Sequence, residues 1–184
     1  MNRYHLQPPV TTEEVQRLKA GDIVTITGTI YTARDAAHKR LVEALKAGQE
    51  LPLELQGQII YYVGPTPAQP GRISGSAGPT TSGRMDPYTP ALLNEGLKVM
   101  IGKGRRSPEV ITALKKFGAV YLGIVGGTAA LVAQAIKKVD VVAYADLGPE
   151  AIHRLYVEGL TTMVLIDSAG RDLYEIEPAK YASL

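Results

Sequence analysis

Short hydrophobic runs alternate with helix-forming stretches along most of the chain. Residues 33–48 have the periodicity of a helix that stops at Gly48. Ala37, Leu41 and Leu45 share one stripe of this segment. Runs rich in β-branched and aromatic residues predict strands at residues 22–31, 58–64, 97–102, 119–125 and 139–145.

Capping signals mark the ends of further helices. Thr11 and Glu14 have capping-box spacing, which predicts a short helix that stops at Gly21. Asp86 followed by proline predicts an N-cap for a helix that ends near Gly96.

The same cap-and-proline signal recurs later in the chain. Ser107 followed by proline predicts a helix that reaches Gly118. Gly28, inside the first long strand, indicates a β-bulge or a close approach of another backbone.

The C-terminal third combines both kinds of element. Residues 119–145 indicate a strand, a Gly-rich turn, a helix and a strand, which has βαβ character. Residues 149–158 fit either a short helix or a helix followed by a strand. Residues 162–176 predict a hairpin that turns at residues 168–170.

A connection without periodicity runs from residue 65 to about residue 85. Structureless loops longer than about 12 to 15 residues inside a compact domain are usually functional. Gly78 and Gly83 have the spacing of a phosphate loop, but Arg84 replaces its lysine and Met85 replaces its hydroxyl, which argues against nucleotide binding. The many hydroxyl groups could instead form hydrogen bonds with the loop backbone. The sequence shows no convincing base and orienting residue that would make one of these hydroxyl groups a nucleophile.

Composition indicates one globular domain over residues 1–184, with 45% hydrophobic and 21% charged residues. A net charge of +2 gives no general attraction to nucleic acids or anionic membranes. The absence of cysteine excludes disulfides, a thiol nucleophile and thiolate ligation of a metal by this chain. Because no signal peptide or membrane span is evident, a cytoplasmic location is expected.

Two local clusters have a structural explanation beside a functional one. The turn at residues 123–128 could cradle an anion, or its glycines could let a helix pack closely against a strand. The stretch GKGRRS, residues 102–107, gathers three cations at a strand end, where ligand sites of α/β sheets lie. Each single Lys or Arg there is nevertheless expected to be a solvated surface charge.

The histidines give no sign of a metal site. His5, His38 and His153 are far apart in the sequence and lack metal-ligand spacing, so no metal ligand is expected in this chain. His38 differs from the others because it lies one helical turn from Arg34, on the same face.

Six motifs follow one another along the chain. They are GTIYTARDAAHKRL (28–41), YYVGPTPA (61–68), SGSAGPTTSGRMDPYTPALL (74–93), VMIGKGRRS (99–107), VGGTAAL (125–131) and ADLGPEAIHRL (145–155). Together they resemble the β subunit, or C-terminal domain, of the iron–sulfur class I fumarate hydratases and L-tartrate dehydratases. The likeness covers the chain from about residue 10 to residue 178, and ARDxAH combined with GPTTSGRMD is specific.

This resemblance implies a fold, a cofactor and a partner. The fold is an α/β swivelling β/β/α domain, in which helices flank a mixed sheet. In such enzymes a separate α subunit, or N-terminal domain, holds a [4Fe–4S] cluster through cysteines, with one iron open to the substrate. Because this chain has no cysteine and begins at its own Met1, the resemblance implies half of an enzyme, completed by an α subunit in a heterodimer or heterotetramer.

The resemblance also assigns roles to individual residues. Arg34, Arg84 and Lys103 match the cations that hold substrate carboxylates, and Thr80 matches the residue proposed as the base for the C3 proton. Guanidinium groups bind carboxylates in a fixed orientation, so this set suits a dicarboxylate. Fixed cations would also stabilise the charge that builds up when a proton leaves next to a carboxylate.

Some assignments leave alternatives open. Asp35, His38 and Thr81 match supporting positions near the site. A threonine hydroxyl is too weakly acidic to ionise unaided, so Thr80 could act as the base or only donate a hydrogen bond. The preferred activity is hydration of fumarate to (S)-malate, tartrate dehydration to oxaloacetate is the nearest alternative, and a non-catalytic anion-binding or assembly module is a third.

Overall fold

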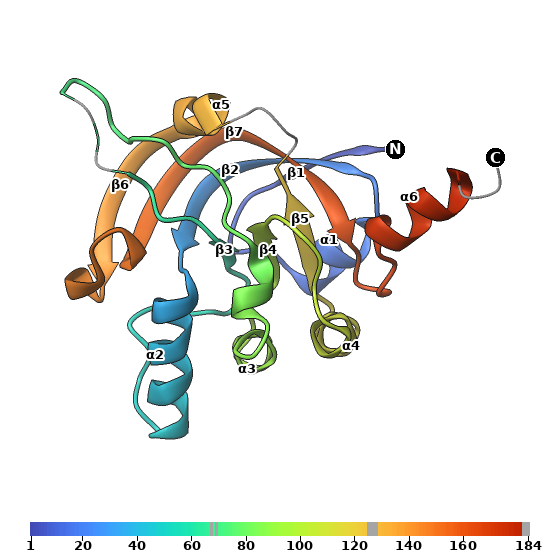
Figure 1. The fold of residues 1–184 in the computed structure, drawn as a ribbon, viewed down its shortest axis with the longest axis horizontal. Coiled ribbons are helices and arrows are strands. Elements are labelled where there is room, and N and C mark those ends of the chain that lie inside the picture. Colours follow the sequence, from blue (N-terminus) through green and yellow to red (C-terminus); the bar gives the residue numbers. More distant parts are fainter. Residues whose placement is uncertain (67, 69, 125–128, 182–184) are drawn as a thin grey trace.

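A computed structural model describes residues 1–66, 68, 70–124 and 129–181 of the chain. Within these ranges, one mixed sheet contains seven strands in the order β1-β2-β3-β4-β5-β7-β6 (Figure 1). The strands are β1 (Arg3–Leu6), β2 (Ile23–Thr32), β3 (Ile59–Tyr61), β4 (Val99–Gly102), β5 (Val120–Gly123), β6 (Ile136–Ala143) and β7 (Ile152–Ile166). The expectation of an α/β fold with a mixed sheet and flanking helices is confirmed.

The sheet closes on itself through β7. Strands β1 to β5 pair in parallel, whereas β7 runs antiparallel to β2, β5 and β6. Because β7 pairs with β2 as well as with β5, the pairings β2-β3-β4-β5-β7 return to their starting strand. The register between β2 and β7 shifts between Ile26 and Gly28. A Cβ atom at Gly28, which has φ +130°, would lie 3.2 Å from the Pro8 ring and 3.9 Å from Pro8 N, so the alternative of a close backbone approach agrees with the structure.

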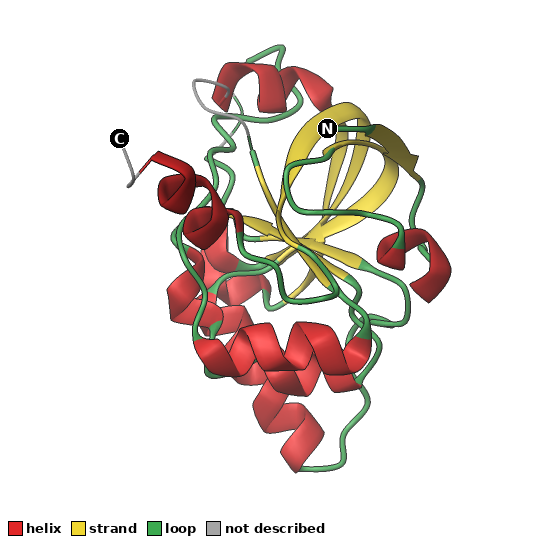
Figure 2. Cartoon of the chain, turned by 90° about the vertical axis from the view of Figure 1, so that its right-hand side faces the viewer, coloured by secondary structure: helices red, strands yellow, loops and turns green. Residues whose placement is uncertain are grey.

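Helices flank the sheet. They are α1 (Thr12–Gln16), α2 (Asp35–Lys46), α3 (Thr89–Asn94), α4 (Pro108–Phe117), α5 (Ala129–Ala135) and α6 (Leu173–Tyr181), with 3-10 turns η1 (Ser82–Met85) and η2 (Ala145–Glu150). Figure 1 shows α2, α3 and α4 together on one side of the strands, and Figure 2 shows further helices around the strands. No helix in the described ranges is long and apolar enough to cross a bilayer.

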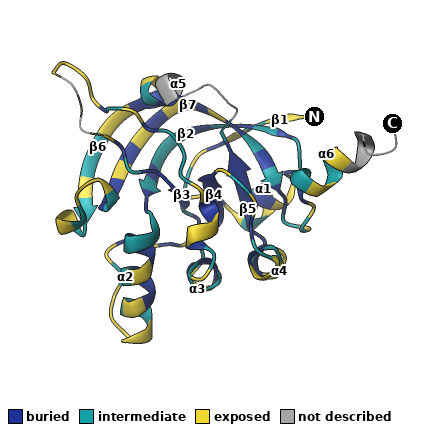
Figure 3. Cartoon of the chain, in the orientation of Figure 1, coloured by how far each residue is buried: buried dark blue, intermediate teal, exposed yellow. Residues whose placement is uncertain are grey.

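Two hydrophobic cores lie on opposite faces of the central strands. The first contains Val99 and Ile101 of β4 together with apolar residues of β2 and β7. The second contains Met100 of the same strand together with Leu41 of α2 and Leu92 of α3. Because successive side chains of a strand point to opposite faces, β3, β4 and β5 are buried on both sides (Figure 3).

Two of the three predicted helix starts are confirmed. Thr11 and Glu14 form the capping box of α1, and Ser107 Oγ accepts from Val110 N at the start of α4. Helix α1 ends at Gln16, before the predicted Gly21, as the chain turns back toward β2.

The prediction that Asp86 is an N-cap is wrong. Helix α3 begins later, at Thr89, and its N-cap residue Tyr88 makes no capping bond. The Asp86 carboxylate instead accepts from Arg106 Nε and from Ser107 N. A long-range ionic contact has displaced the local capping bond.

The predictions for the C-terminal third need three corrections. Residues 136–138 belong to β6, not to a helix, and β6 pairs antiparallel with β7, so 119–145 is not a parallel βαβ unit. Residues 149–158 contain the end of η2 and the start of β7, which agrees with the helix-then-strand alternative. The turn at 168–170 is confirmed, but helix α6 follows it in place of a second hairpin strand.

Candidate functional site

The predicted site residues gather at the carboxyl ends of three neighbouring parallel strands. Arg34 follows β2, Tyr62 follows β3, and Lys103 directly follows β4. In α/β sheets, ligands commonly bind outside the carboxyl ends of parallel strands. The order of the sheet therefore brings together segments that are far apart in the sequence.

The long connection returns to the same edge of the sheet and pairs there. Thr80 N donates to Tyr62 O at 2.7 Å, and Lys103 N donates to Thr80 O at 3.3 Å. Thr81 and Lys103 form an isolated parallel β-bridge, and Ser82 N donates to Lys103 O at 2.9 Å. Backbone pairing therefore fixes Thr80 and Thr81 beside Lys103.

Two arginines approach one carboxylate oxygen. Arg34 Nε lies 4.0 Å and Arg84 Nη1 lies 3.9 Å from Asp35 Oδ1. These separations are too long for hydrogen bonds. Arg34 Nε and Asp35 Oδ1 are buried and have no hydrogen-bond partner among the described residues. The two guanidinium groups thus converge on one carboxylate oxygen without a hydrogen bond to it.

Arg34 is held from two further directions. Arg34 Nη2 lies 3.0 Å from Glu150 Oε1, in the last residue of η2. A Cβ atom placed on Gly64 would lie 3.2 Å from Arg34 Nη1 and 2.9 Å from Pro149 O. Glycine at position 64 therefore allows the backbone after β3 to approach the Arg34 side chain closely.

His38 lies beneath the site as a buried, uncharged ring. Its Nδ1 is 2.8 Å from Arg34 O, and because a carbonyl only accepts, Nδ1 carries the hydrogen. Burial lowers the pKa of His38 to about 4, helped by the nearby Arg106 charge and opposed by the Arg34 carbonyl. Nε2 has no partner among the described residues, and the ring meets the Tyr62 ring edge-on at 5.2 Å.

The structure thus divides the predicted residues into three groups. Arg34, Asp35 and Arg84 come together through their side chains, whereas Thr80, Thr81 and Lys103 come together through the backbone. Only three residues separate Thr80 from Arg84 in the sequence, so the first two groups adjoin. His38 is buried and faces the interior. The roles assigned to all seven residues stay predictions.

Sequence reasoning missed two residues that support the site. Arg106 was expected to be a solvated surface charge, but its side chain is fully buried against Asp86. The adjacent Arg105 is 61% exposed and pairs with Glu175, which agrees with the surface expectation. Two successive arginines in one loop look alike in the sequence, so no local signal distinguishes them. Glu150, the partner of Arg34, lies within the ADLGPEAIHRL motif, but the motif gave it no role.

The other candidate features add little to this site. Residues 125–128 of the Gly-rich turn lie outside the described residues. At Gly123, a Cβ atom would lie 2.5 Å from the Leu165 side chain, so a larger residue would require that side chain to move. No group of three or more His, Asp or Glu residues in the described ranges could hold a metal ion. That the chain supplies no metal ligand stays a prediction.

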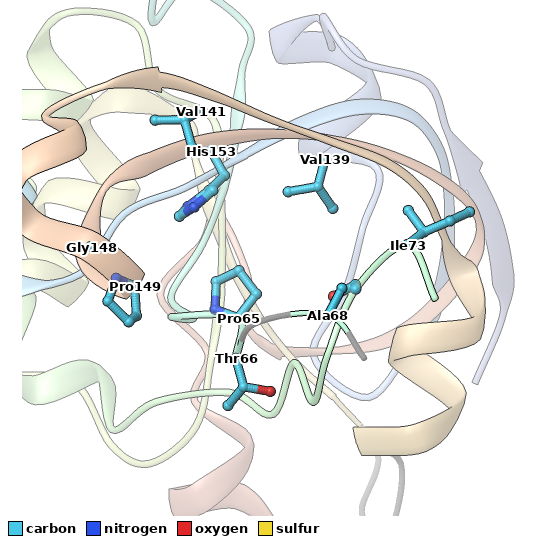
Figure 4. A pocket seen from close by; sticks show the side chains of 10 residues that line it. Pro65, Thr66, Ala68, Ile73, Val139, Val141, Gly148, Pro149 and His153 are labelled. Atoms are coloured by element: carbon cyan, nitrogen blue, oxygen red, sulfur yellow. The ribbon is translucent and has the colours of Figure 1, made fainter. Parts of the chain in front are cut away.

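A cavity of about 350 Å³ has Pro149 in its lining, and none of the seven candidate residues lines it (Figure 4). Most of its lining is apolar, from the long connection and from β6. Among the described lining residues, His153 is the one titratable group, and burial lowers its pKa. The lining includes Pro65, Ile73, Val139, Val141, Pro149 and His153.

Comparison with known proteins supports one family. Residues 1–176 match the family described as "Fumarase C-terminus". Fumarate hydratase 1, mitochondrial, of Leishmania major is 43% identical over 169 residues, which cover 91% of this chain and 31% of that protein. The anaerobic class I fumarate hydratase of Escherichia coli is 45% identical over 154 residues, which cover 83% of this chain and 28% of that protein.

A further relative is close to this chain in length. The putative L(+)-tartrate dehydratase subunit beta of Methanocaldococcus jannaschii is 39% identical over 172 residues, which cover 90% of this chain and 88% of that protein. The chain therefore spans about a third of the fumarate hydratases but most of the tartrate dehydratase subunit. These matches confirm the resemblance found in the motifs, and the chain belongs to the fumarase C-terminus family.

Proposed function

We propose that residues 1–184 form one domain that acts as the β subunit of a hydro-lyase, which hydrates fumarate reversibly to (S)-malate. One observation carries the proposal: Arg34, Arg84, Thr80 and Lys103 gather at the carboxyl ends of adjacent parallel strands. Family membership supports the same reaction class.

The cations would bind and orient the substrate. Arg34 and Arg84 converge beside Asp35, where Arg34 Nε makes no hydrogen bond, so a substrate carboxylate bound there would compete with Asp35 for the two guanidinium groups. Lys103 is exposed on the neighbouring segment and would receive the second carboxylate. Two fixed sites for two carboxylates would align the carbon chain between them, which favours reaction at one face.

Thr80 would transfer the proton at C3. In the direction of dehydration, its ionised hydroxyl oxygen would take the C3 proton, the electron pair of the C3–H bond would form the double bond between C2 and C3, and the hydroxyl group on C2 would leave as hydroxide. Its backbone is hydrogen-bonded on both sides, to Tyr62 and to Lys103, so the residue is held next to a cation. Nearby positive charge would favour an ionised hydroxyl. The alternative role for Thr80 is a hydrogen bond to the substrate.

An iron–sulfur cluster would have to be bound by another chain. This chain has no cysteine, and its described residues offer no group of ligands for a metal ion, so they do not fit as cluster ligands. We therefore propose that an α subunit holds the [4Fe–4S] cluster and that this chain is active only together with it. A cytoplasmic location stays a prediction.

Dehydration of L-tartrate is the second candidate activity. It is favoured by one observation, the similar length of the Methanocaldococcus jannaschii subunit. Tartrate is also a dicarboxylate, so the same cations suit it. A non-catalytic anion-binding module is the third candidate, and the presence of all four matching site residues argues against it.

One experiment distinguishes these candidates. The chain is co-expressed with its α-like partner under anaerobic conditions, the cluster is reconstituted, and hydration of fumarate is compared with dehydration of L-tartrate and D-tartrate. Turnover of fumarate is expected to be faster than turnover of either tartrate. Faster turnover of L-tartrate would support the second candidate, and turnover of none of these substrates would contradict the hydro-lyase proposal.

A further inference from the structure

A buried arginine joins the segments that carry Arg84 and Lys103. The side chain of Arg106 is 0% exposed. Its Nε donates to Asp86 Oδ1 at 2.6 Å, and its Nη2 donates to Thr89 Oγ1 at 2.8 Å. Both acceptors lie just after Arg84, whereas Arg106 lies just after Lys103. One guanidinium group therefore connects the two segments.

The acceptors of Arg106 extend this connection through second bonds of their own. Asp86 Oδ2 accepts from Ser107 N at 2.7 Å, at the N-cap of α4. Thr89 Oγ1 donates to Met85 O at 2.8 Å, at the end of η1. The carboxylate and the hydroxyl group thus fix η1 and the start of α3 against the start of α4.

Two tyrosine rings enclose the guanidinium group. The Arg106 guanidinium carbon lies 4.9 Å from the centre of the Tyr121 ring and 5.4 Å from that of Tyr62. The carbonyl of Tyr62 accepts from Thr80 N, and the hydroxyl group of Tyr121 bonds to Ser82 Oγ at 2.8 Å. The residues that pack on Arg106 therefore also bind the loop that carries the candidate site.

The choice of arginine at this position indicates a geometric role. Burying a charge is costly, and an apolar side chain of similar volume often gives equal or greater stability. An apolar side chain would not fix the direction of its neighbours, whereas the planar fork of arginine imposes angles on each hydrogen bond. Arg106 uses two directions of that fork to bind Asp86 and Thr89.

We propose that Arg106 is a positioning residue, which fixes the spacing between Arg84 and Lys103 without contacting the substrate. That spacing would set the separation at which the site receives the two carboxylates of one substrate. The identity of the ligand rests on the proposed function, whereas the positioning rests on the hydrogen bonds of Arg106.

A double-mutant cycle in the reconstituted complex tests this role. Arg106→Met should lower kcat/KM for fumarate at least about tenfold when Arg84 is present. In the Arg84→Ala background the loss should be less than about threefold, because Arg106 is proposed to act by placing Arg84. Arg105→Met, at the exposed neighbour, is the control and should leave kcat/KM within about twofold. Equal losses in both backgrounds, or no loss, would overturn the proposal.

Hydrogen exchange in the same complex gives a readout that does not depend on activity. The amides of Ser82 and Ser107 should lose protection in Arg106→Met and keep it in Arg105→Met. Unchanged protection in Arg106→Met would overturn the positioning role. An inactive wild-type complex would contradict the proposed function alone, and exchange would still decide the role of Arg106.

A milder variant covers the case in which Arg106→Met does not fold. Arg106→Lys keeps the charge but loses the fork, so its loss of kcat/KM should also shrink in the Arg84→Ala background, with partial loss of protection at Ser107. Normal kinetics and normal protection in Arg106→Lys would overturn the proposal.

Discussion

Thr81 and Lys103 form an isolated parallel β-bridge that continues the edge of β4 into the long connection. A lysine that follows one strand is thereby placed beside a threonine from a loop more than twenty residues earlier in the chain. Because the bridge is made of backbone bonds, it holds Thr81 and its neighbour Thr80 beside Lys103. This pairing extends the carboxyl end of β4 with a segment of the long connection.

Replacing Arg84 tests its role in binding the substrate. Arg84→Ala should lower kcat/KM by at least about a hundredfold, the scale of a lost charge-assisted contact of about 3 kcal/mol. Steady-state kinetics of the reconstituted complex measure this effect. Arg72→Ala, at an exposed arginine of the same connection, is the matched control and should behave like the wild type. Near-normal kinetics of Arg84→Ala would remove this residue from the site.

Two substitutions of Thr80 separate its possible roles. Thr80→Ala should abolish turnover while leaving substrate affinity within about threefold, because the base acts only in the transition state. Thr80→Ser keeps a hydroxyl group and should retain measurable turnover. Retained activity in Thr80→Ala would favour the alternative in which the hydroxyl only donates a hydrogen bond.

Adding a side chain at position 64 should displace the Arg34 side chain, although residue 34 itself is not substituted. In Gly64→Ala the new methyl group would lie 2.9 Å from Pro149 O and 3.2 Å from Arg34 Nη1, so one of them must move. Misplacement of a binding group by about 1 Å can cost about a hundredfold in rate, and a loss of kcat/KM of at least about tenfold is expected.

The control for Gly64→Ala is a glycine in open surroundings. At Gly83 an added Cβ atom would have no neighbour within 4 Å, so Gly83→Ala should leave the melting temperature unchanged. Melting curves of both variants show whether any kinetic loss in Gly64→Ala comes with loss of the fold. Wild-type kinetics in a folded Gly64→Ala protein would contradict the proposed role of this close approach.

The buried ring of His38 should make stability depend on pH. Its pKa is lowered by burial to about 4, against about 6.5 for an unfolded histidine, so the unfolded state binds more protons between these values. The contribution of the uncharged His38 ring to the free energy of unfolding is therefore complete above about pH 6.5 and is lost as the pH falls toward 4. For one such group it amounts to at most about 3 kcal/mol.

Urea unfolding at several pH values between about 4.5 and 7 measures this dependence. His38→Gln should flatten the curve of unfolding free energy against pH, whereas His5→Gln, at an exposed position, should not. His153 is unchanged in both variants, so its own contribution cancels in the comparison. The same slope in His38→Gln as in the wild type would show that His38 is not the group responsible.

Much of the local structure was predictable because its signals are local. The capping boxes and the glycine stops act within one turn of a helix, so Ser107 and Gly118 correctly mark the ends of α4. Asp86 shows where this reasoning fails, since its capping signal is intact but its carboxylate binds Arg106 and Ser107 from another element. In the same way, the DLYEI segment after the turn at residues 168–170 forms a helix although its sequence pattern suggested a strand.

By itself, the sequence determined most of the strands and helices before residue 125, the position of the long connection, the lack of cysteine ligands and the family to which the chain belongs. Only the tertiary structure decided that β7 closes the sheet onto β2, that Arg34 and Arg84 converge on Asp35, and that Arg106 is buried. The physical reason is the range of the interactions. Periodicity and capping depend on residues a few positions apart, whereas strand pairing and the burial of a charge depend on partners that the folded chain brings together from distant positions.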